Sequence, residues 1–213
     1  MRAFLCVVAT MLFSIGALQA QSLKTIKLNQ PNKNRGAVVT KALADRHSER
    51  EFSTKKLSLQ DLSDLLWAAN GVNRADGRRT AASALNKQDI DVYVIMEEGA
   101  YLYDAKAHQL TPVVAGDHRG LIAGQQASVK EAPVSLLLVS DLAKFGDSPA
   151  KSKTQLFAAV DAGLVSQNIA LFCSGCGLVT VPRGSMDADG LKKTLKLRDD
   201  QLVILNNPVG YKK

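Results

Sequence analysis

The sequence predicts an α+β sandwich built around one hydrophobic core. The chain has 213 residues, of which 46% are apolar, and a chain of that length can bury a full core without disulfide or metal staples. Helical and strand-like patterns follow one another in mixed order. The strand-like runs 91–96 and 100–104 are separated by a short turn, as in a hairpin, and the apolar run 135–140 is typical of a buried central strand. Together these patterns indicate a single α+β domain.

The N-terminal residues 1–20 have the pattern of a secretory signal peptide. Arg2 supplies a positive start, Phe4 to Leu18 is mostly apolar, and Gln19-Ala20 precedes a suitable cleavage point. This apolar run is shorter than the roughly 18 residues that a membrane span requires, and no later segment is expected to reach that length. We therefore expect an exported protein, periplasmic or extracellular, without a stable membrane anchor. An uncleaved anchor is the alternative.

The first part of the mature chain predicts an arm and two helices. Residues 21–35 are polar and indicate an extended N-terminal arm, and the domain proper spans 36–213. The spacing of apolar residues over 36–44 predicts a first helix. Ser58 and Asp61 form a capping box at the start of a second helix, which Gly71 ends.

The rest of the chain continues the mixed order. Within 91–96 the even-numbered residues face one side of the sheet and the odd-numbered residues face the other. The remaining predicted elements are helices over 121–130, 152–173 and 189–195 and strands over 178–181 and 202–205.

The positive charge of the chain is modest and scattered. Removing residues 1–20 takes away only Arg2 and lowers the formal net charge from +7 to +6. A nucleic-acid binder is expected to cluster its basic residues and to interleave aromatic ones, which make up only 5% here. A solvated basic surface with one anion pocket explains the charge better.

A possible anion pocket follows the first predicted helix, at Arg46-His47-Ser48-Glu49-Arg50-Glu51-Phe52. Residues two apart on an extended segment point the same way, so two guanidiniums and a hydroxyl can form charge-assisted bonds to phosphate oxygens. A solvated charged loop is the alternative, because Glu49 and Glu51 lie nearby. We call residues 46–52 the cradle segment.

A second segment offers hydroxyl and amide groups at alternate positions, at Ser83-Ala84-Leu85-Asn86-Lys87-Gln88. Such donors and acceptors suit recognition of the edge of a flat heterocycle. A phosphate cradle combined with a ring-reading segment suggests a flavin mononucleotide (FMN) site, and therefore a redox enzyme.

Five stretches in order resemble motifs of the nitroreductase superfamily. Residues 46–52 and 83–88 resemble its two N-terminal flavin motifs. The later landmarks are Asp161-Ala162-Gly163 with Gln167-Asn168, Gly177-Leu178 with Val181-Pro182, and the closing Val209-Gly210-Tyr211. Leu66-Trp67-Ala68-Ala69-x-Gly71, followed by Arg78-Arg79-Thr80, is similar to the branch related to azoline-oxidising dehydrogenases. The likeness covers residues 36–213.

This resemblance implies a nitroreductase-like three-layer sandwich, with a central mixed antiparallel sheet flanked by helices. It implies that the cradle segment holds the ribityl-phosphate and that Asn86 bonds the O2/N3 edge of the ring. Residues 182–185 would pass near N5, where a backbone N–H can stabilise charge on the reduced flavin. The implied cofactor-binding residues are Arg46, His47, Ser48, Arg50, Ser83, Asn86, Gln88, Pro182, Arg183, Gly184 and Ser185.

The chain also differs from the family pattern. It carries Asp89-Ile90 where relatives usually have Pro-Trp after the glutamine. No side chain is identified as the catalytic proton donor, and Arg183, Tyr93 and Tyr101 are candidates by chemistry alone. Whether Lys212 and Lys213 add to the phosphate site is left open.

The implied function is that of an FMN-dependent oxidoreductase that transfers hydride or electrons in two steps through flavin N5, to or from a small organic substrate. The resemblance also implies a homodimer with each flavin at the subunit interface, which the 21–35 arm is available to wrap. NAD(P)H is one possible donor. An exported enzyme would not meet a pool of NAD(P)H, so another reduced carrier, or action as an oxidase or dehydrogenase, stays as the alternative. A non-catalytic flavin-binding protein and an extracytoplasmic binding module for another phosphate ligand stay as alternatives.

The cysteine pair and the histidines point to no further chemistry. Cys173 and Cys176 end the longest predicted helix, whereas a redox C-x-x-C normally opens one, where the helix N-terminus lowers a thiol pKa. Three alternatives remain for this pair: buried or idle thiols, which are favoured, then a local disulfide, then catalysis. His47, His108 and His118 lack metal-binding spacing, so no metal site is expected.

Overall fold

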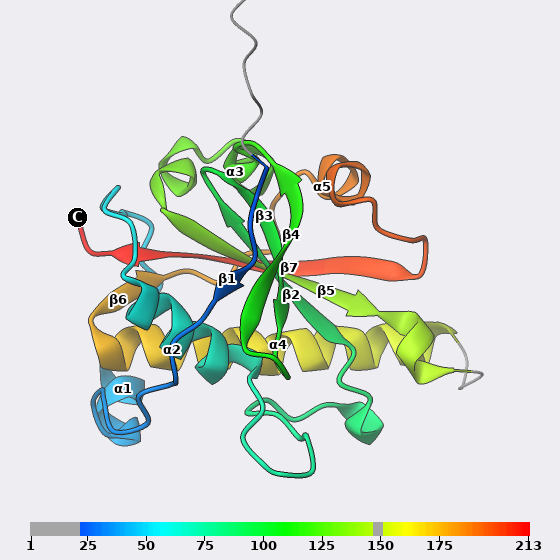
Figure 1. Cartoon of the computed structure of the whole chain (residues 1–213), viewed down its shortest axis with the longest axis horizontal. Coiled ribbons are helices and arrows are strands. Elements are labelled where there is room, and N and C mark those ends of the chain that lie inside the picture. The colour runs from blue at the N-terminus through cyan, green and yellow to red at the C-terminus, as the bar shows by residue number, and fades with distance from the viewer. Residues whose placement is uncertain (1–21, 147–150) are drawn as a thin grey trace, which may run out of the picture.

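The computed structural model describes residues 22–146 and 151–213 and shows a seven-stranded sheet with helices on both faces (Figure 1). The strand order is β1-β4-β3-β2-β5-β7-β6, and each pairing between neighbours is antiparallel. The predicted α+β sandwich is therefore confirmed, with a sheet that is antiparallel throughout the described pairings. The predicted signal peptide, residues 1–20, lies outside the described residues.

The elements follow the predicted mixed order. The strands are Ile26–Lys27 (β1), Ile90–Met96 (β2), Gly99–Asp104 (β3), Gln109–Ala115 (β4), Val134–Asp141 (β5), Leu178–Thr180 (β6) and Gln201–Tyr211 (β7). The α-helices are Val39–Asp45 (α1), Leu59–Asn70 (α2), Arg119–Ala123 (α3), Lys151–Cys176 (α4) and Ala188–Leu195 (α5). Short 3-10 helices cover Ala84–Asn86 (η1), Ala127–Glu131 (η2) and Leu142–Phe145 (η3).

Alternation along the central strands divides the core into two layers. Val92 and Val94 of β2 pack in the cluster that contains α2 and α4, whereas Tyr93 and Ile95 pack in the cluster that contains α3 and α5. The predicted alternation is thus confirmed. Burying a side chain of this size contributes about 1.5–3 kcal/mol, so a one-residue slip of β2 would exchange the two faces at a large cost.

The long helix α4 is the main helix of one outer layer. Its side chains at Ala158, Ala162 and Ile169 are completely buried, and in Figure 1 it runs across the lower part of the molecule with α1 beside its C-terminal end. By length and composition alone, Ser152–Cys176 is apolar enough to cross a membrane. This corrects the expectation that no later segment reaches that length, although one face of the helix forms the core of this domain.

The first and third α-helices are shorter than the sequence indicates. Helix α1 begins at Val39 rather than at residue 36, because Gly36 has a left-handed φ of +94° and the Ala37 N–H donates to the Gly175 carbonyl oxygen at 2.8 Å. The expected helix over 121–130 is divided into α3 and η2 at Gly124. That residue has a φ of +56°, which glycine adopts without the penalty of a Cβ.

The N-terminal arm lies against helix α2 of its own chain. The Asn29 N–H donates to the Ser63 hydroxyl at 2.9 Å, and the Asn32 N–H donates to the Asp64 carboxylate at 2.7 Å. Arg35 then forms ion pairs with Asp64 at 2.9 Å and with Asp61 at 2.8 Å. The described part of the arm is therefore fixed by α2, and its predicted contact with a partner chain stays a prediction.

Candidate functional site

The cradle segment runs beside β6 and β7. The Glu49 N–H donates to the Thr180 carbonyl oxygen at 3.0 Å, and Phe52 forms an antiparallel bridge with Lys212. The Phe52 side chain is completely buried, so one apolar residue anchors the segment. Its polar neighbours stay at the surface, where a ligand can reach them.

Arg46 and Arg50 are available to bind an anion. In the described part of the chain, no carboxylate lies within ion-pair distance of either guanidinium. Glu49 instead accepts hydrogen bonds from the N–H groups of Arg50 and Glu51 at 2.8 and 3.1 Å. The Glu51 N–H, followed by that of Arg50, holds the pKa of Glu49 below its ordinary value. Glu49 is therefore occupied by neighbouring backbone N–H groups and leaves the two arginines free.

Two more cationic or titratable groups lie near the cradle segment. Lys212 pairs with Phe52 across the sheet and is electrostatically coupled to Glu49. The Nδ1 of His47 is 2.8 Å from the Asp45 carbonyl oxygen, and its Nε2 is 3.9 Å from a Glu49 oxygen. His47 also lines a small cavity of about 110 Å³. It is thus oriented by the end of α1, unlike the two arginines.

Arg183 has a structural position that the sequence did not reveal. Its guanidinium donates to the carbonyl oxygens of Ile122 and Ala123 at 2.9 and 3.2 Å. It also donates to the side-chain oxygens of Asn206 and Gln126 at 3.0 and 3.1 Å. Burial, and then the nearby positive charge of Arg50, lowers the pKa of Arg183. The side chain fixes the end of α3 and is not free to contact a ligand.

The backbone around Arg183 offers two free donors. The Arg183 N–H donates to the Asn206 carbonyl oxygen at 2.9 Å, so it is already used. Among the described residues, the N–H groups of Gly184 and Ser185 have no hydrogen-bond partner. Pro182, Gly184 and Ser185 are all exposed. The part of the 182–185 segment that can present an N–H to a ligand is therefore Gly184-Ser185.

The ring-reading segment, residues 83–88, has an unusual backbone. Leu85, Asn86 and Gln88 have φ values of +53°, +52° and +49°, a left-handed conformation that L-residues rarely adopt and that costs about 1–3 kcal/mol each. The Gln88 N–H donates to the Ser83 hydroxyl at 2.8 Å, which closes the segment into a loop. Asn86 is exposed. We call residues 83–88 the reader loop.

Two buried carboxyl groups lie under the reader loop. The Ala84 N–H donates to both carboxylate oxygens of Asp161, at 3.1 and 2.8 Å. The Ser140 hydroxyl donates to Asp89 Oδ2 at 2.5 Å. Asp89 is 0% exposed and Asp161 is 2% exposed. In the sequence, Asp161 stands out only as a family landmark and Asp89 only as a departure from the family pattern. The isolated acid at 161 within an apolar helix was the one visible signal of a buried carboxyl group.

The cradle segment and the reader loop lie near different parts of α4 (Figure 1). The Ser174 hydroxyl donates to the carbonyl oxygen of Ala42 in α1, which places the cradle segment at the C-terminal end of α4. The reader loop is fixed to Asp161. Thirteen residues of helix separate Asp161 from Ser174, which corresponds to about 20 Å along the axis. A single chain therefore holds the two predicted halves of the site apart.

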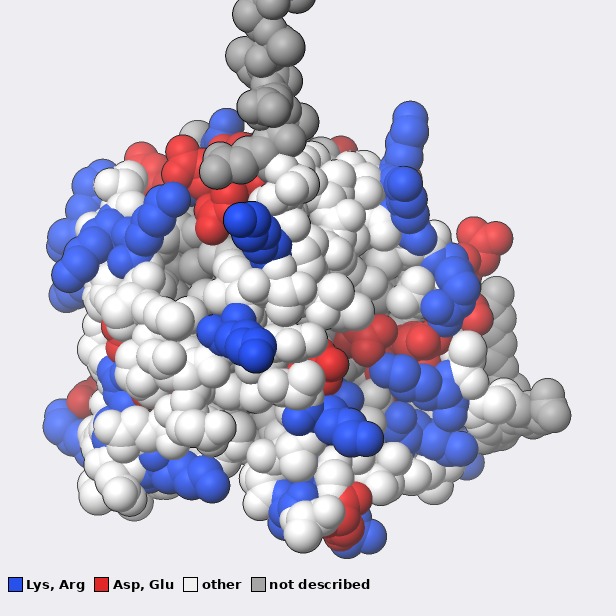
Figure 2. All heavy atoms as spheres, in the orientation of Figure 1, with Lys and Arg blue, Asp and Glu red and all other residues white. Residues whose placement is uncertain are grey.

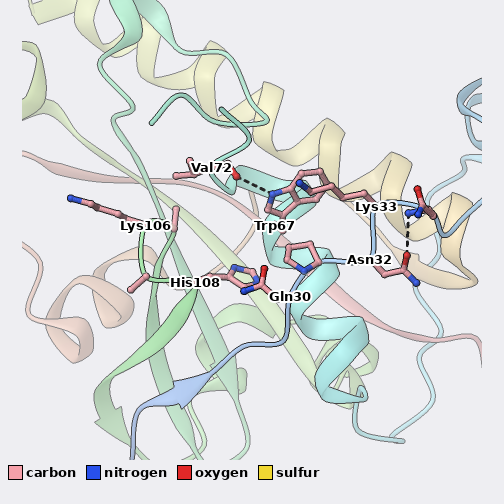
Figure 3. Close-up of a pocket in the computed structure, with 11 residues that line it drawn as sticks. Gln30, Asn32, Lys33, Trp67, Val72, Lys106 and His108 are labelled. Atoms are coloured by element: carbon pink, nitrogen blue, oxygen red, sulfur yellow. Dashed lines mark hydrogen bonds between the residues drawn. The ribbon is translucent and has the colours of Figure 1, made fainter. Parts of the chain in front are cut away.

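The most prominent cavity lies away from the predicted residues. A cavity of about 680 Å³ lies between the arm, the β3–β4 connection and Trp67, and Figure 3 shows the residues that line it. Lys33 lies over the Trp67 ring at 5.4 Å from its centroid, and the Trp67 N–H donates to the Val72 carbonyl oxygen at 3.0 Å. In the described residues, the cradle arginines, the reader loop and residues 182–185 do not line it.

The remaining candidates by chemistry are structural or unreactive. Tyr93 and Tyr101 are 6% and 3% exposed, so neither hydroxyl can serve an open site, and burial raises the pKa of both. Cys173 and Cys176 are free thiols at the end of α4. Burial raises the pKa of both, although Arg35 opposes the effect at Cys176. This favours the prediction of idle thiols over catalysis.

Neither the face shown in Figure 2 nor the metal-ligating side chains of the described residues indicate a second site. Lysine and arginine side chains are scattered over the face shown in Figure 2, with acidic groups between them. Within 22–146 and 151–213, no group of three or more His, Cys, Asp or Glu side chains is placed to hold a metal ion.

Comparisons with known proteins give a consistent result. The model of the Nitroreductase family matches residues 43–211. A candidate nitroreductase of Methanocaldococcus jannaschii is 28% identical over 183 residues, which cover 80% of this chain and 89% of the relative. The crystal structure of a candidate nitroreductase from Ralstonia eutropha is 36% identical, covers 91% of each chain and has a TM-score of 0.85.

A more distant likeness concerns the fold alone. A candidate NAD(P)H:FMN oxidoreductase from Staphylococcus epidermidis has a TM-score of 0.63 at 14% identity, with 86% of this chain and 91% of that chain covered.

Proposed function

Because this chain belongs to the nitroreductase family, we propose that it is an FMN-dependent oxidoreductase acting on a small organic substrate. The observation that carries the proposal is the cradle segment, in which Arg46 and Arg50 are free of carboxylate partners within the described residues. Two unpaired guanidiniums on an anchored segment are suited to a phosphate group, because they donate charge-assisted hydrogen bonds to several of its oxygens.

The backbone at Gly184-Ser185 supplies the second part of the site. These two N–H groups have no partner among the described residues. They belong to an exposed segment next to Arg183, whose side chain is buried and bound to α3. Electrostatic coupling between Arg183 and Arg50 indicates that this segment is near the cradle. Bound FMN would supply the hydride and electron chemistry, and a preorganised N–H near N5 would stabilise the charge that develops there.

We propose that the third part, the reader loop, comes from a second copy of the chain. The separation of about 20 Å along α4 argues against one flavin being held by the cradle segment and Asn86 of the same chain. A two-fold pairing can place the reader loop of one subunit opposite the cradle segment of the other. The site would then be complete only in the dimer.

Exposed apolar side chains support this pairing. On α4, Leu156, Val160 and Leu164 are 61%, 52% and 41% exposed, and their spacing of four residues places them in one stripe. Val39 of α1 and Leu85 of the reader loop are also exposed. Apolar side chains gathered on α4 around Asp161, where the reader loop is fixed, are typical of a surface that a partner covers. A second copy is the partner that also completes the site.

For the electron donor and the substrate, we propose chemical classes. The name of one distant neighbour includes NAD(P)H and FMN, which makes NAD(P)H the first donor to test. A reduced carrier outside the cytoplasm is the alternative if residues 1–20 direct export. Because of the finer resemblance to azoline-oxidising dehydrogenases, we propose peptides that contain azoline rings as one substrate class.

Anaerobic flavin reduction tests the proposed function. We expect the purified protein, reconstituted with FMN, to bind the flavin stoichiometrically and to be reduced by a physiological donor such as NADPH. Reduction by dithionite but by no biological donor would favour a non-catalytic flavin-binding protein. A chain that binds inorganic phosphate or other phosphate esters, but not FMN, would favour the binding-module alternative and contradict the proposal.

A further inference from the structure

The two buried carboxyl groups under the reader loop have an unexplained arrangement. Asp161 comes from the middle of α4 and Asp89 from the residue that follows the loop, and both are almost completely buried. Asp89 Oδ2 accepts the Ser140 hydroxyl proton. Asp89 Oδ1 is buried without any hydrogen-bond donor among the described residues. A buried oxygen without a donor costs free energy and requires an explanation.

A proton held between Asp89 and Asp161 would supply the hydrogen bond that Asp89 Oδ1 lacks. The Asp161 carboxyl acts on the Asp89 carboxyl both through a side-chain hydrogen bond and through charge repulsion, so the two groups face each other in the buried layer under the loop. Two ionised carboxylates cannot hydrogen-bond each other, and at this distance they repel. One proton placed between them removes the repulsion and gives Asp89 Oδ1 its partner. This leaves one net negative charge, which two oxygens of Asp161 share while they accept the Ala84 N–H.

We propose that Asp89 and Asp161 share one proton and that this carboxyl pair fixes the reader loop in the conformation that presents Asn86. Asp161 holds the start of the loop through Ala84, and Asp89 directly follows its end. The pair therefore connects the two ends of a loop with three left-handed residues. Both aspartates are positioning residues, and this role rests on the proposed function of the loop.

The charged groups around the pair do not replace the shared proton. Arg79 is electrostatically coupled to Asp89, but its guanidinium donates to the Ile90 carbonyl oxygen at 3.4 Å, and its buried Nε has no hydrogen-bond partner among the described residues. From η3, Lys144 binds Asp91 at 2.8 Å and the Gln88 carbonyl oxygen at 3.2 Å. Ser140 of β5 contributes a neutral hydroxyl. No described cation donates a hydrogen bond to either carboxyl of the pair.

The proposal predicts a linkage between protons and flavin. Loss of the shared proton would leave two adjacent carboxylates under the loop, and their repulsion would displace it. If the loop must be in place to bind FMN, then FMN affinity falls when the pair ionises. Coupling of this kind typically changes affinity by about 5- to 150-fold.

Infrared difference spectroscopy of the apo protein tests the shared proton directly. We expect the carbonyl stretch of a protonated carboxylic acid at neutral pH in the native chain. The band should be lost in Asp89→Asn and in Asp161→Asn. In each variant the new amide donates a hydrogen bond to the remaining carboxylate, which then needs no proton, and the loop is preserved. Asp91→Asn, which removes a carboxylate two residues from Asp89, is the control and should keep the band. A native protein without the band, or a band that survives Asp89→Asn, would overturn the shared proton.

Titration of FMN affinity between about pH 5 and about pH 9 tests the positioning role. We expect the affinity of the native chain to fall at least about fivefold as the pair ionises, and Asp89→Asn to bind FMN with little dependence on pH. An equal pH dependence in both proteins would overturn the role. If no variant and no native protein binds FMN, the proposed function and the positioning role fail together, while the infrared band still decides the shared proton.

Discussion

At the residue scale, the cradle arginines carry the most direct prediction. Replacing Arg46 and Arg50 together by alanine removes two charge-assisted contacts, each of which contributes about 1.5–3 kcal/mol. We therefore expect FMN affinity to fall at least about 100-fold, with an unchanged circular dichroism spectrum. The matched control is Lys24→Ala with Lys27→Ala, which removes the same charge from the exposed arm and β1. Equal flavin affinity in the arginine variant and the native chain would exclude the cradle.

Asp89 predicts how stability depends on pH. Burial, followed by the neighbouring Asp161 carboxyl, raises the pKa of Asp89 to about 7, compared with about 4 for an unfolded aspartate. The folded state therefore binds the proton more tightly. The contribution of this group to stability is fully present below about pH 4 and is lost as the pH rises to the folded pKa.

Urea denaturation at a series of pH values measures this contribution. Relative to Asp89→Asn, the free energy of unfolding of the native chain should fall by about 1.4 kcal/mol per pH unit where only the folded state holds the proton. Asp91→Asn is the control for removing a neighbouring carboxylate. Parallel pH curves for the native chain and Asp89→Asn would contradict the raised pKa.

At the scale of elements, most of the fold could be predicted because its strands and helices have clear periods. The hairpin of β2 and β3, the central strand β5 and the long helix α4 all lie where the apolar pattern places them. Strand β4 was missed because Pro112 interrupts its pattern. The register with β3 shifts between Ala100 and Tyr101, opposite this part of β4, and proline is tolerated at such an irregularity. Strand β1 has only two residues, too few for any period.

The candidate site could be predicted only as segments. The side chains of Arg46 and Arg50 are recognisable by charge and spacing alone. The burial of Arg183 depends on carbonyl groups of α3, about 60 residues away in sequence, and no local pattern reports such a contact. The distance between the cradle segment and the reader loop follows from where each meets α4, which is also a tertiary property.

The apolar stripe on α4 predicts an effect on assembly. Val160 lies at its centre and is 52% exposed. Val160→Lys should leave the monomer folded, because the side chain points to solvent, and should disrupt the dimer by placing a charge in its apolar interface. Sedimentation velocity measures the change. The control is Lys193→Glu on α5, in the opposite layer. A native protein that sediments as a monomer would contradict the pairing.

At the scale of the whole molecule, the proposed exchange of reader loops predicts complementation between two inactive variants. One chain carries Arg46→Ala with Arg50→Ala, and the other carries Asn86→Ala. If each site combines a cradle segment and a reader loop from different subunits, then every heterodimer contains one intact site. Random pairing of equal amounts would restore about a quarter of the native sites, since half of all dimers are heterodimers.

Co-expression of the two variants with different tags allows the heterodimer to be isolated. We expect FMN bound to half of its sites, whereas each variant alone should stay largely without flavin at the same FMN concentration. A heterodimer without flavin would mean that both segments act within one chain, and the arrangement along α4 would then need to change on binding.

The central claim is that this chain is a flavoprotein, and the absorbance spectrum of the purified protein tests it most directly. We expect the two visible and near-ultraviolet bands of an oxidised flavin, and a released cofactor with the mass of FMN. A colourless protein that also fails to take up added FMN would contradict the claim. The nitroreductase fold would then be present without its flavin chemistry.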